Sequence, residues 1–396
     1  MKSVLVSAFI TLLLSLSSLA FAENAEMKEK ESMREIKRVS ADRASANAVV
    51  SSNGRYIAFH SAASNLVQND NNNHQDIFVY DREMQTMERV SVATDGTEAN
   101  NYSQYTSISG DGRYVAFMSL ANNLVKNKDD NYQPDIFVHD RVNKTTKLVS
   151  KSLEGTTGNT KSLNPSISKD GGHIVFESFS NNLIENDENE NADIFVYSID
   201  DESIELVSIT SDNKQANHRC GTPAISSDGR YVVYHSAARN LVPEDNKRSD
   251  AEEWNFSDVF LRDRELNKTE LISVNLEGMP GNHPSFHASI SGDGRYVAFT
   301  SMAKDLVKDY PQTSIYVGGR GRVARRIDIY VRDRDTNTTR LVSATSDQTP
   351  GNHQSQAPKI STDGRYVSFQ SAATNLVDNA MPGVTINIFR KDLVEN

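Results

Sequence analysis

Oxygen-bearing side chains recur at one spacing in the first half of this sequence. The pattern D-x-N-x-x-x-D occurs at Asp70, Asn72 and Asp76, at Asp129, Asn131 and Asp135, and at Asp187, Asn189 and Asp193. Calcium takes about six to eight oxygen ligands and favours carboxylates and amide carbonyls. The spacing therefore predicts Ca²⁺ as a cofactor in these three loops. The alternative is that the same side chains accept backbone N–H groups and cap a turn.

Histidine is placed at a second recurring position. The phrases A-N-H and G-N-H end at His218, His283 and His353, in three successive copies of a longer repeat. Imidazoles that converge can ligate a metal or act as acid and base, which makes these three residues candidate catalytic groups. The alternative is that each histidine serves its own loop and lies too far from the others to share a site.

Two insertions interrupt the later repeats and combine aromatic with cationic side chains. Rings and guanidinium groups on one face can bind an acidic sugar or a peptide carboxylate by stacking and paired hydrogen bonds. The predicted ligand-binding residues are Trp254, Tyr310, Tyr316, Arg320, Arg322, Arg325 and Arg326. Tyr316 is also a candidate catalytic base. The alternative is a solvated loop without a ligand.

The composition narrows the partners and the compartment. A formal net charge of −11 argues against nucleic acid and anionic lipid. Residues 1–22 combine Lys2, an apolar run and the site Ala20-Phe21-Ala22, which predicts a signal peptide cleaved after Ala22 and no membrane span afterwards. We therefore expect a periplasmic or secreted protein. The single Cys220 cannot form an internal disulfide, so the fold must rely on its core.

The candidate site residues lie between copies of a sequence motif of the type S-x-D-G-R-Y-V-A-F, which occurs six times. The turn glycines of the six copies are Gly54, Gly112, Gly171, Gly229, Gly294 and Gly364. Successive glycines are separated by 58, 59, 58, 65 and 70 residues, and such a period indicates a repeat architecture. Each copy contains four short alternating segments, which is typical of a propeller blade. The predicted fold is all-β, a six-bladed β-propeller with four antiparallel strands per blade.

The last copy has only three strand signals, at 358–361, 365–371 and 387–393. The segment E-I-K-R-V-S at 35–40 matches the fourth-strand phrases of other copies, such as M-E-R-V-S at 87–91. We therefore expect residues 35–40 to complete the sixth blade and close the ring, which removes exposed sheet edges. The predicted organisation is a signal peptide at 1–22, a polar linker at 23–34 and one propeller at 35–396.

The phrases S-x-D-G-R-Y-V-A-F and D-I-F-V-x-D-R resemble the TolB-type, WD-repeat-like propeller repeat across nearly the whole predicted mature chain. The resemblance implies an exported propeller that serves as a platform for protein interactions. The separate α/β domain that precedes the propeller in TolB is not expected, because only 12 residues lie between Ala22 and Glu35. A Tol–Pal role is therefore not implied.

Two functions follow from these features. The first is a non-catalytic binding protein for an envelope or secreted protein, or for a cell-envelope polymer such as an acidic polysaccharide. We expect it to bind through the face that bears the two insertions, residues 243–257 and 308–327. The alternative is a secreted lyase or hydrolase that acts on an acidic glycan. A lyase needs a base, for which His283 or Tyr316 is a candidate, and a cation beside the uronate carboxylate, such as Arg320 or Ca²⁺.

Overall fold

The computed structural model describes residues 43–126, 132–244, 256–311, 315–317, 323–377 and 386–394. For residues 315–317 and 323–325 it describes the backbone only. The predicted signal peptide (1–22), linker (23–34) and closing strand (35–40) lie outside these residues and remain predictions.

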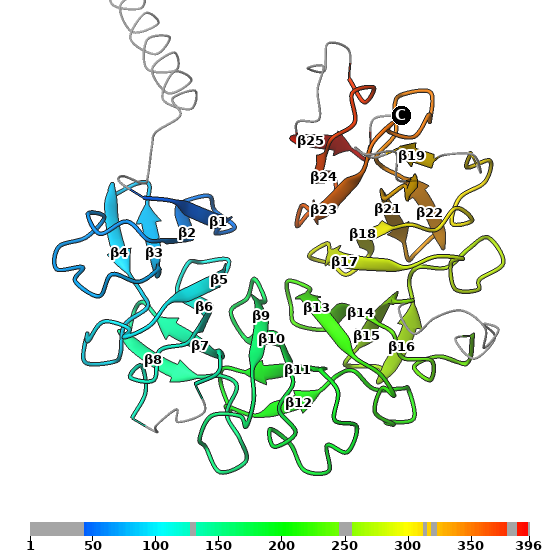
Figure 1. Cartoon of the computed structure of the whole chain (residues 1–396). Helices are drawn as coiled ribbons and strands as arrows, with labels where there is room; N and C mark the ends of the chain where they lie inside the picture. Colours follow the sequence, from blue (N-terminus) through cyan, green and yellow to red (C-terminus); the bar gives the residue numbers. More distant parts are fainter. Residues whose placement is uncertain are drawn as a thin grey trace, which may run out of the picture. The chain divides into compact units, whose positions relative to one another are not determined.

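Antiparallel sheets follow one another along the chain and are arranged around a central channel, with an opening between the first and the last sheet (Figure 1). The first blade contains β1 (Ser45–Val50), β2 (Tyr56–Ser61), β3 (Asp76–Asp81) and β4 (Thr86–Arg89). The second contains β5 (Ser103–Ile108), β6 (Tyr114–Ser119), β7 (Asp135–Asp140) and β8 (Thr145–Leu148). The third contains β9 (Ser162–Ile167), β10 (His173–Ser178), β11 (Asp193–Ser198) and β12 (Ile204–Leu206).

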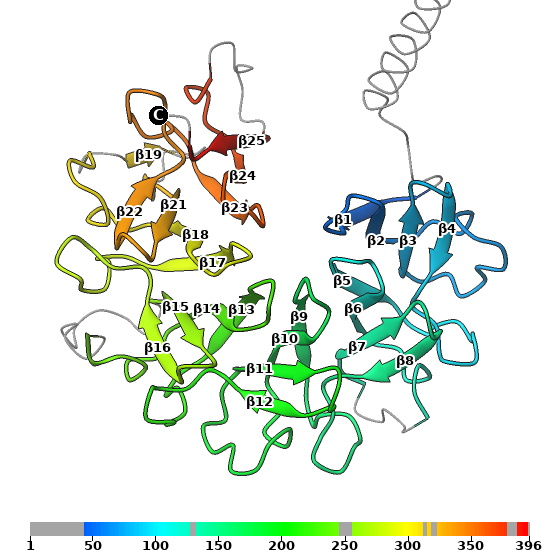
Figure 2. The same ribbon diagram turned by 180° about the vertical axis from the view of Figure 1, so that it is seen from behind.

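The later blades repeat this order, and the view from behind shows the same succession (Figure 2). The fourth contains β13 (Cys220–Ile225), β14 (Tyr231–Ser236), β15 (Asp258–Asp263) and β16 (Lys268–Leu271). The fifth contains β17 (Ser285–Ile290), β18 (Tyr296–Ser301), β21 (Asp328–Asp333) and β22 (Thr338–Leu341), with an inserted hairpin of β19 (Ile315–Val317) and β20 (Val323–Arg325). The sixth contains β23 (Ser355–Ile360), β24 (Tyr366–Ser371) and β25 (Asn387–Asp392). The predicted six-bladed propeller is confirmed.

The repeated glycine lies where successive blades meet most closely. Gly112 has a φ of 78°, and a Cβ atom added to it would lie 2.1 Å from Cδ2 of Tyr56 in the preceding blade. Glycine is therefore needed for two reasons: it adopts the left-handed turn, and it leaves room for the aromatic ring of Tyr56. The same contact recurs between Tyr114 and Gly171, His173 and Gly229, Tyr231 and Gly294, and Tyr296 and Gly364.

Backbone hydrogen bonds join the blades at the level of these turns. The N–H of Ser52 in blade one donates to the carbonyl of Gly110 in blade two at 2.9 Å. The bonds at the next four junctions are Gly110 N–H to Lys169 O, Asp170 N–H to Ser227 O, Ser227 N–H to Gly292 O, and Gly292 N–H to Thr362 O. Four of these bonds join equivalent residues, and at the junction of blades three and four the donor, Asp170, is one residue later in the turn. The turns of neighbouring blades thus bond one another at all five junctions, which explains why a similar turn sequence recurs at each of them.

Apolar side chains form the core between blades. Strand alternation sends Val115 and Phe117 of β6 toward blade one, and Ala116 and Met118 toward blade three. Five buried clusters result, each made by two neighbouring blades. Because blades two to five bury both faces of their sheets in these clusters, each of them depends on both of its neighbours for stability.

The repeated polar residues serve the scaffold. The buried hydroxyl of Ser119 accepts the N–H of Ala121 at 3.0 Å. Asn123 accepts the N–H of Asn100 and donates to a backbone carbonyl at 2.8 Å. Asp81 accepts two N–H groups of the turn between the third and fourth strands and pairs with Arg55 at 2.8 Å. These repeated side chains therefore have a structural role.

The junction between blades six and one differs from the other five. Ile388 on β25 is 72% exposed, whereas the equivalent residues are 0% exposed in the other blades, at Ile77, Ile136, Ile194, Val259 and Ile329. On the first blade, Val50 is 48% exposed, whereas its equivalent Ile108 is 1% exposed. Among the described residues, this junction also has no backbone bond of the kind that links the other turns. Apolar surface is therefore left uncovered on both sides of it.

We expect Gly112→Ala to destabilise the fold more than Gly96→Ala. Gly96 has a φ of 86° but no atom within 4 Å of an added Cβ, so it isolates the cost of the left-handed backbone. That cost is about 1–2 kcal/mol, and forcing a methyl group against Tyr56 adds about 1–3 kcal/mol. Urea unfolding of both variants measures the difference. If both variants lose the same free energy of unfolding, the contact with the aromatic ring of Tyr56 does not require glycine.

Deletion of residues 35–40 is expected to lower the melting temperature far more than deletion of residues 24–29. The first segment is the predicted partner of the β25 edge, where Ile388 is exposed, whereas the second lies in the predicted linker. The two deletions remove the same number of residues, so chain length is matched. Thermal unfolding of the two proteins gives the comparison, and equal melting temperatures would refute the closing strand.

Candidate functional site

The three predicted histidines lie in the loops that lead into the first strands of blades four, five and six. Each is partly exposed. The Nδ1 atom of His218 accepts the N–H of Arg219 at 2.9 Å, and that of His283 lies 2.9 Å from Oδ1 of Asn282. Within the described residues, no three His, Cys, Asp or Glu side chains are grouped to hold a metal ion, so His218, His283 and His353 form no such set.

The first acidic loop is occupied by a side chain of the protein itself. Arg89 on β4 lies 3.1 Å from Asp70 and 3.8 Å from Asp76. Asn72 donates its amide N–H to Asp76 at 2.7 Å and accepts the N–H of His74, so it caps a turn. The guanidinium group thus supplies the positive charge that a calcium ion would bring.

In the third loop the position of Arg89 is taken by Leu206. Asn189 again donates to Asp193 at 2.7 Å, and Ser208 donates to the same carboxyl at 2.6 Å. Burial raises the pKa of Asp193 to about 7 and also raises that of Asp187, whose Oδ1 atom has no partner among the described residues. Asp135 is held similarly by Ser150, while Asp129 and Asn131 lie outside the described residues. Calcium binding stays a prediction.

Most of the predicted aromatic and cationic patch lies beyond what the structure describes. Trp254, Arg320 and Arg322 are outside the described residues, and only the backbone of Tyr316 and Arg325 is described, in β19 and β20. Tyr310 is buried, and its hydroxyl donates to Asp328 at 2.6 Å. Arg326 is largely buried and donates to the carbonyl of Pro350 at 3.3 Å. These last two side chains therefore support the fold of blade five.

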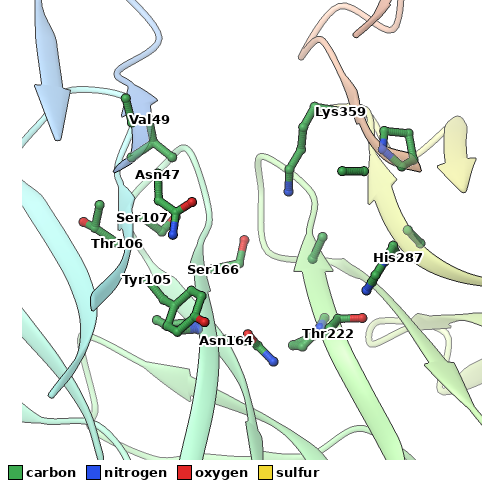
Figure 3. A pocket seen from close by; sticks show the side chains of 17 residues that line it. Asn47, Val49, Tyr105, Thr106, Ser107, Asn164, Ser166, Thr222, His287 and Lys359 are labelled. Carbon is green, nitrogen blue, oxygen red and sulfur yellow. The ribbon is translucent and has the colours of Figure 1, made fainter. Parts of the chain in front are cut away.

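The central channel forms a cavity with a volume of about 450 Å³. It is lined by the first strand of every blade, and Figure 3 shows side chains from several blades pointing into it. Each of these strands contains a β-bulge, visible as a shift of register against the second strand. A bulge inserts one extra residue and redirects its side chain.

The bulged residue has a positive φ in all six blades. The six residues are Asn47 at 52°, Tyr105 at 51°, Asn164 at 54°, Thr222 at 44°, His287 at 52° and Ala357 at 54°. This conformation costs a residue other than glycine about 1–3 kcal/mol, and such strain concentrates at functional sites. The scaffold thus presents one side chain from each blade to the channel, and five residue types occur among the six.

Sequence reasoning did not identify this ring. The first strands read S-A-N-A-V-V, S-Q-Y-T-S-I, S-L-N-P-S-I, C-G-T-P-A-I, S-F-H-A-S-I and S-Q-A-P-K-I. The first residue of these strands is Ser in five blades and Cys in one, and the last residue is Ile or Val. The third residue, between them, varies from blade to blade. That contrast between fixed and varied positions was the available signal.

A buried carboxylate organises one side of the channel. Glu177 on β10 is 1% exposed, and Arg219 donates to its Oε1 atom at 2.9 Å. Its Oε2 atom accepts the amide N–H of Asn164 at 2.9 Å and the backbone N–H of Thr222 at 3.2 Å. Three donors hold this carboxylate, so it positions two of the bulged residues.

Two histidines extend this cluster around the channel. The Nδ1 atom of His235 lies 2.7 Å from the hydroxyl of Thr222, and its ring meets that of His287 edge to face at 6.3 Å. A Cβ on Gly221 would lie 3.2 Å from Glu177 and 3.3 Å from His235, so glycine leaves room for both. Burial lowers the pKa of His235 to about 4 and also lowers that of His287. Both imidazoles are therefore neutral at pH 7.

Comparison with known proteins establishes the fold. No protein-family model and no curated protein matches this sequence. Solved structures do match, among them the propeller domain of the trilobed protease from Pyrococcus furiosus, at 13% identity and a TM-score of 0.52 over 88% of this chain and 81% of that one. An oligogalacturonate lyase in complex with manganese matches at 12% identity and a TM-score of 0.50, over 90% of this chain and 79% of that one.

TolB from Acinetobacter baumannii also matches, at 14% identity and a TM-score of 0.41, over 76% of this chain. This chain spans 58% of that TolB, which is less than two thirds of its length. At these identities the similarity extends to the propeller fold alone. Within the described residues there is no helix with the length and apolar character needed to cross a membrane.

We expect the stability of this protein to fall between about pH 4 and pH 7 because of Asp193. Its pKa rises from 3.8 to about 7 on folding, so the folded state holds a proton that the unfolded state has lost in this window. Each unit between the two values corresponds to about 1.4 kcal/mol. Melting temperatures measured across the window should fall less in Asp193→Asn than in the wild type. Asp212→Asn, at an exposed carboxyl, is the control; identical profiles for wild type and Asp193→Asn would contradict the assignment.

Proposed function

We propose that this chain is an exported, non-catalytic propeller that binds a protein or a cell-envelope polymer at its central channel. The observation that supports this most is the ring of six bulged residues. The blades repeat their scaffold, yet at this one position they present amide, phenol, hydroxyl, imidazole and methyl groups to the same space. A binding surface is expected to repeat the strained bulge and to vary the side chain at it. The strained backbone is what directs each of these side chains into the channel.

The state of the polar cluster favours binding over catalysis. A general base needs an accessible lone pair within reach of the substrate. Glu177 is buried, and its carboxylate already accepts three hydrogen bonds. It is therefore suited to hold Asn164 and Thr222 in place. The loops first expected to carry the ligand, at 243–257 and 308–327, lie largely outside the described residues and remain part of the proposal as an outer contact surface.

One observation favours an enzyme as the second candidate. His235 and Glu177 both approach Gly221, and His287 faces the channel in its neutral form. A neutral imidazole can remove a proton, so a lyase or hydrolase acting on an acidic glycan is the alternative. A lyase would leave an unsaturated uronate, which absorbs in the ultraviolet. Formation of that product by the purified protein would replace the binding proposal.

The periplasm or the medium is the proposed compartment, based on the predicted signal peptide at 1–22. Fractionation of expressing cells, with detection of the cleaved chain beginning at Glu23, tests this part. Retention of residues 1–22 in the cytoplasm would contradict it.

We expect replacement of channel side chains to abolish capture of the ligand. The mature chain from residue 23 is immobilised and exposed to envelope extract, and retained proteins and polymers are identified. The triple variant Tyr105→Ala, Asn164→Ala and His287→Ala should lose what the wild type retains. Alanine at Met84 and Leu266, which are 65% and 67% exposed on the surface, should not change the result. Equal retention by the channel variant would refute binding at the channel.

A further inference from the structure

We propose that Lys359 anchors a carboxylate group of an acidic saccharide in the central channel. This inference rests on the proposed function and specifies its ligand. Among the 17 residues that line the cavity, Lys359 is the only one that carries a formal charge at neutral pH with histidine neutral. Figure 3 shows its side chain extending from β23 into the space that the other labelled residues face.

The repeat shows that this charge is not required by the blade. Lys359 is the fifth residue of its first strand, and the same position is neutral in the other five blades, at Val49, Ser107, Ser166, Ala224 and Ser289. Two of these serines brace the junctions, because Ser107 accepts the N–H of Ile167 and Ser289 accepts that of Ile360, both at 3.1 Å. Lys359 is the one charged residue among these six equivalent positions, and two of the others show that a neutral residue there can serve the scaffold.

The ammonium group has no counter-ion in the described part of the chain. No described carboxylate lies within ion-pair distance of Lys359, and no described acceptor bonds its Nζ atom. The side chain reaches the water of the channel, yet the surrounding protein removes part of its hydration and lowers its pKa. Its charge in turn lowers the pKa of His287. An unpaired amine in a confined polar space gains more from an anion than one on the open surface does.

The rest of the wall suits a saccharide better than a peptide. Amide and hydroxyl groups of Asn47, Asn164, Ser166 and Thr222 can exchange hydrogen bonds with sugar hydroxyls. Tyr105 is 46% exposed and offers a ring on which a sugar face can stack. The aliphatic residues of the wall are alanine, valine and proline, so the cavity offers no large aliphatic side chain against which a peptide anchor could pack. The volume of about 450 Å³ lies within the ordinary range for ligand sites.

The test compares acidic and neutral forms of one saccharide. Binding of trigalacturonate and of trimannuronate to the mature chain is measured by calorimetry, each beside its full methyl ester. The wild type should bind at least one acid ten-fold more tightly than the ester. Lys359→Met should lose this preference, whereas Lys359→Arg should keep it. Lys169→Met, at a turn outside the cavity, should behave as the wild type.

The outcomes separate this inference from the function on which it rests. Equal affinity of the acid and its ester, or unchanged acid binding in Lys359→Met, would overturn the role of Lys359. Absence of saccharide binding, together with capture of a protein that depends on Tyr105 and His287, would retain the binding channel and reject the saccharide. Melting temperatures of the Lys359 variants are measured in parallel, and no loss is expected because the side chain makes no contact that the fold needs.

Discussion

At each of the five junctions from blade one to blade six, an aromatic or imidazole ring packs against the turn glycine of the next blade, and most of the architecture follows from that contact. The turn has to be left-handed, so its glycine cannot be replaced without strain, and the ring fills the space that a Cβ would take. Once the turns are docked, their backbone groups are in place to bond across the junction, and the alternating apolar residues of the middle strands face each other. Local turn geometry thereby determines the spacing of whole sheets.

The same scaffold explains where functional variety is allowed. The second and third strands of blades two to five are packed on both faces, whereas the innermost strand meets water along the channel. A bulge in that strand turns one side chain per blade inward without disturbing the paired residues on either side. Chemistry can therefore change at these positions while the junctions stay the same. Glu177 shows how such residues are held, since it bonds Asn164 in its own blade and Thr222 in the next.

Sequence alone predicted the blades well because their determinants are local. The D-G turn, the strand alternation and the fixed period each leave a pattern within a few residues, and the structure confirms them. The site was harder to predict, since a positive φ at Tyr105 or His287 has no signature in residue type. The acidic loops illustrate a second limit. Whether Asp70 binds a cation depends on Arg89, which comes from a strand farther along the chain and reaches the loop only in the folded blade.

The uniformity of the five described junctions has a consequence for how such proteins change size. Since these five junctions share the turn, the ring contact and a backbone bond between the turns, a duplicated or lost period of about 58 residues would bring its own docking surfaces with it. The perimeter of the channel would then change in steps of one strand, and each step would add or remove one inward side chain. The number of blades would thus set both the width of the channel and the number of side chains that contact a ligand. Gene duplication could therefore change the two together.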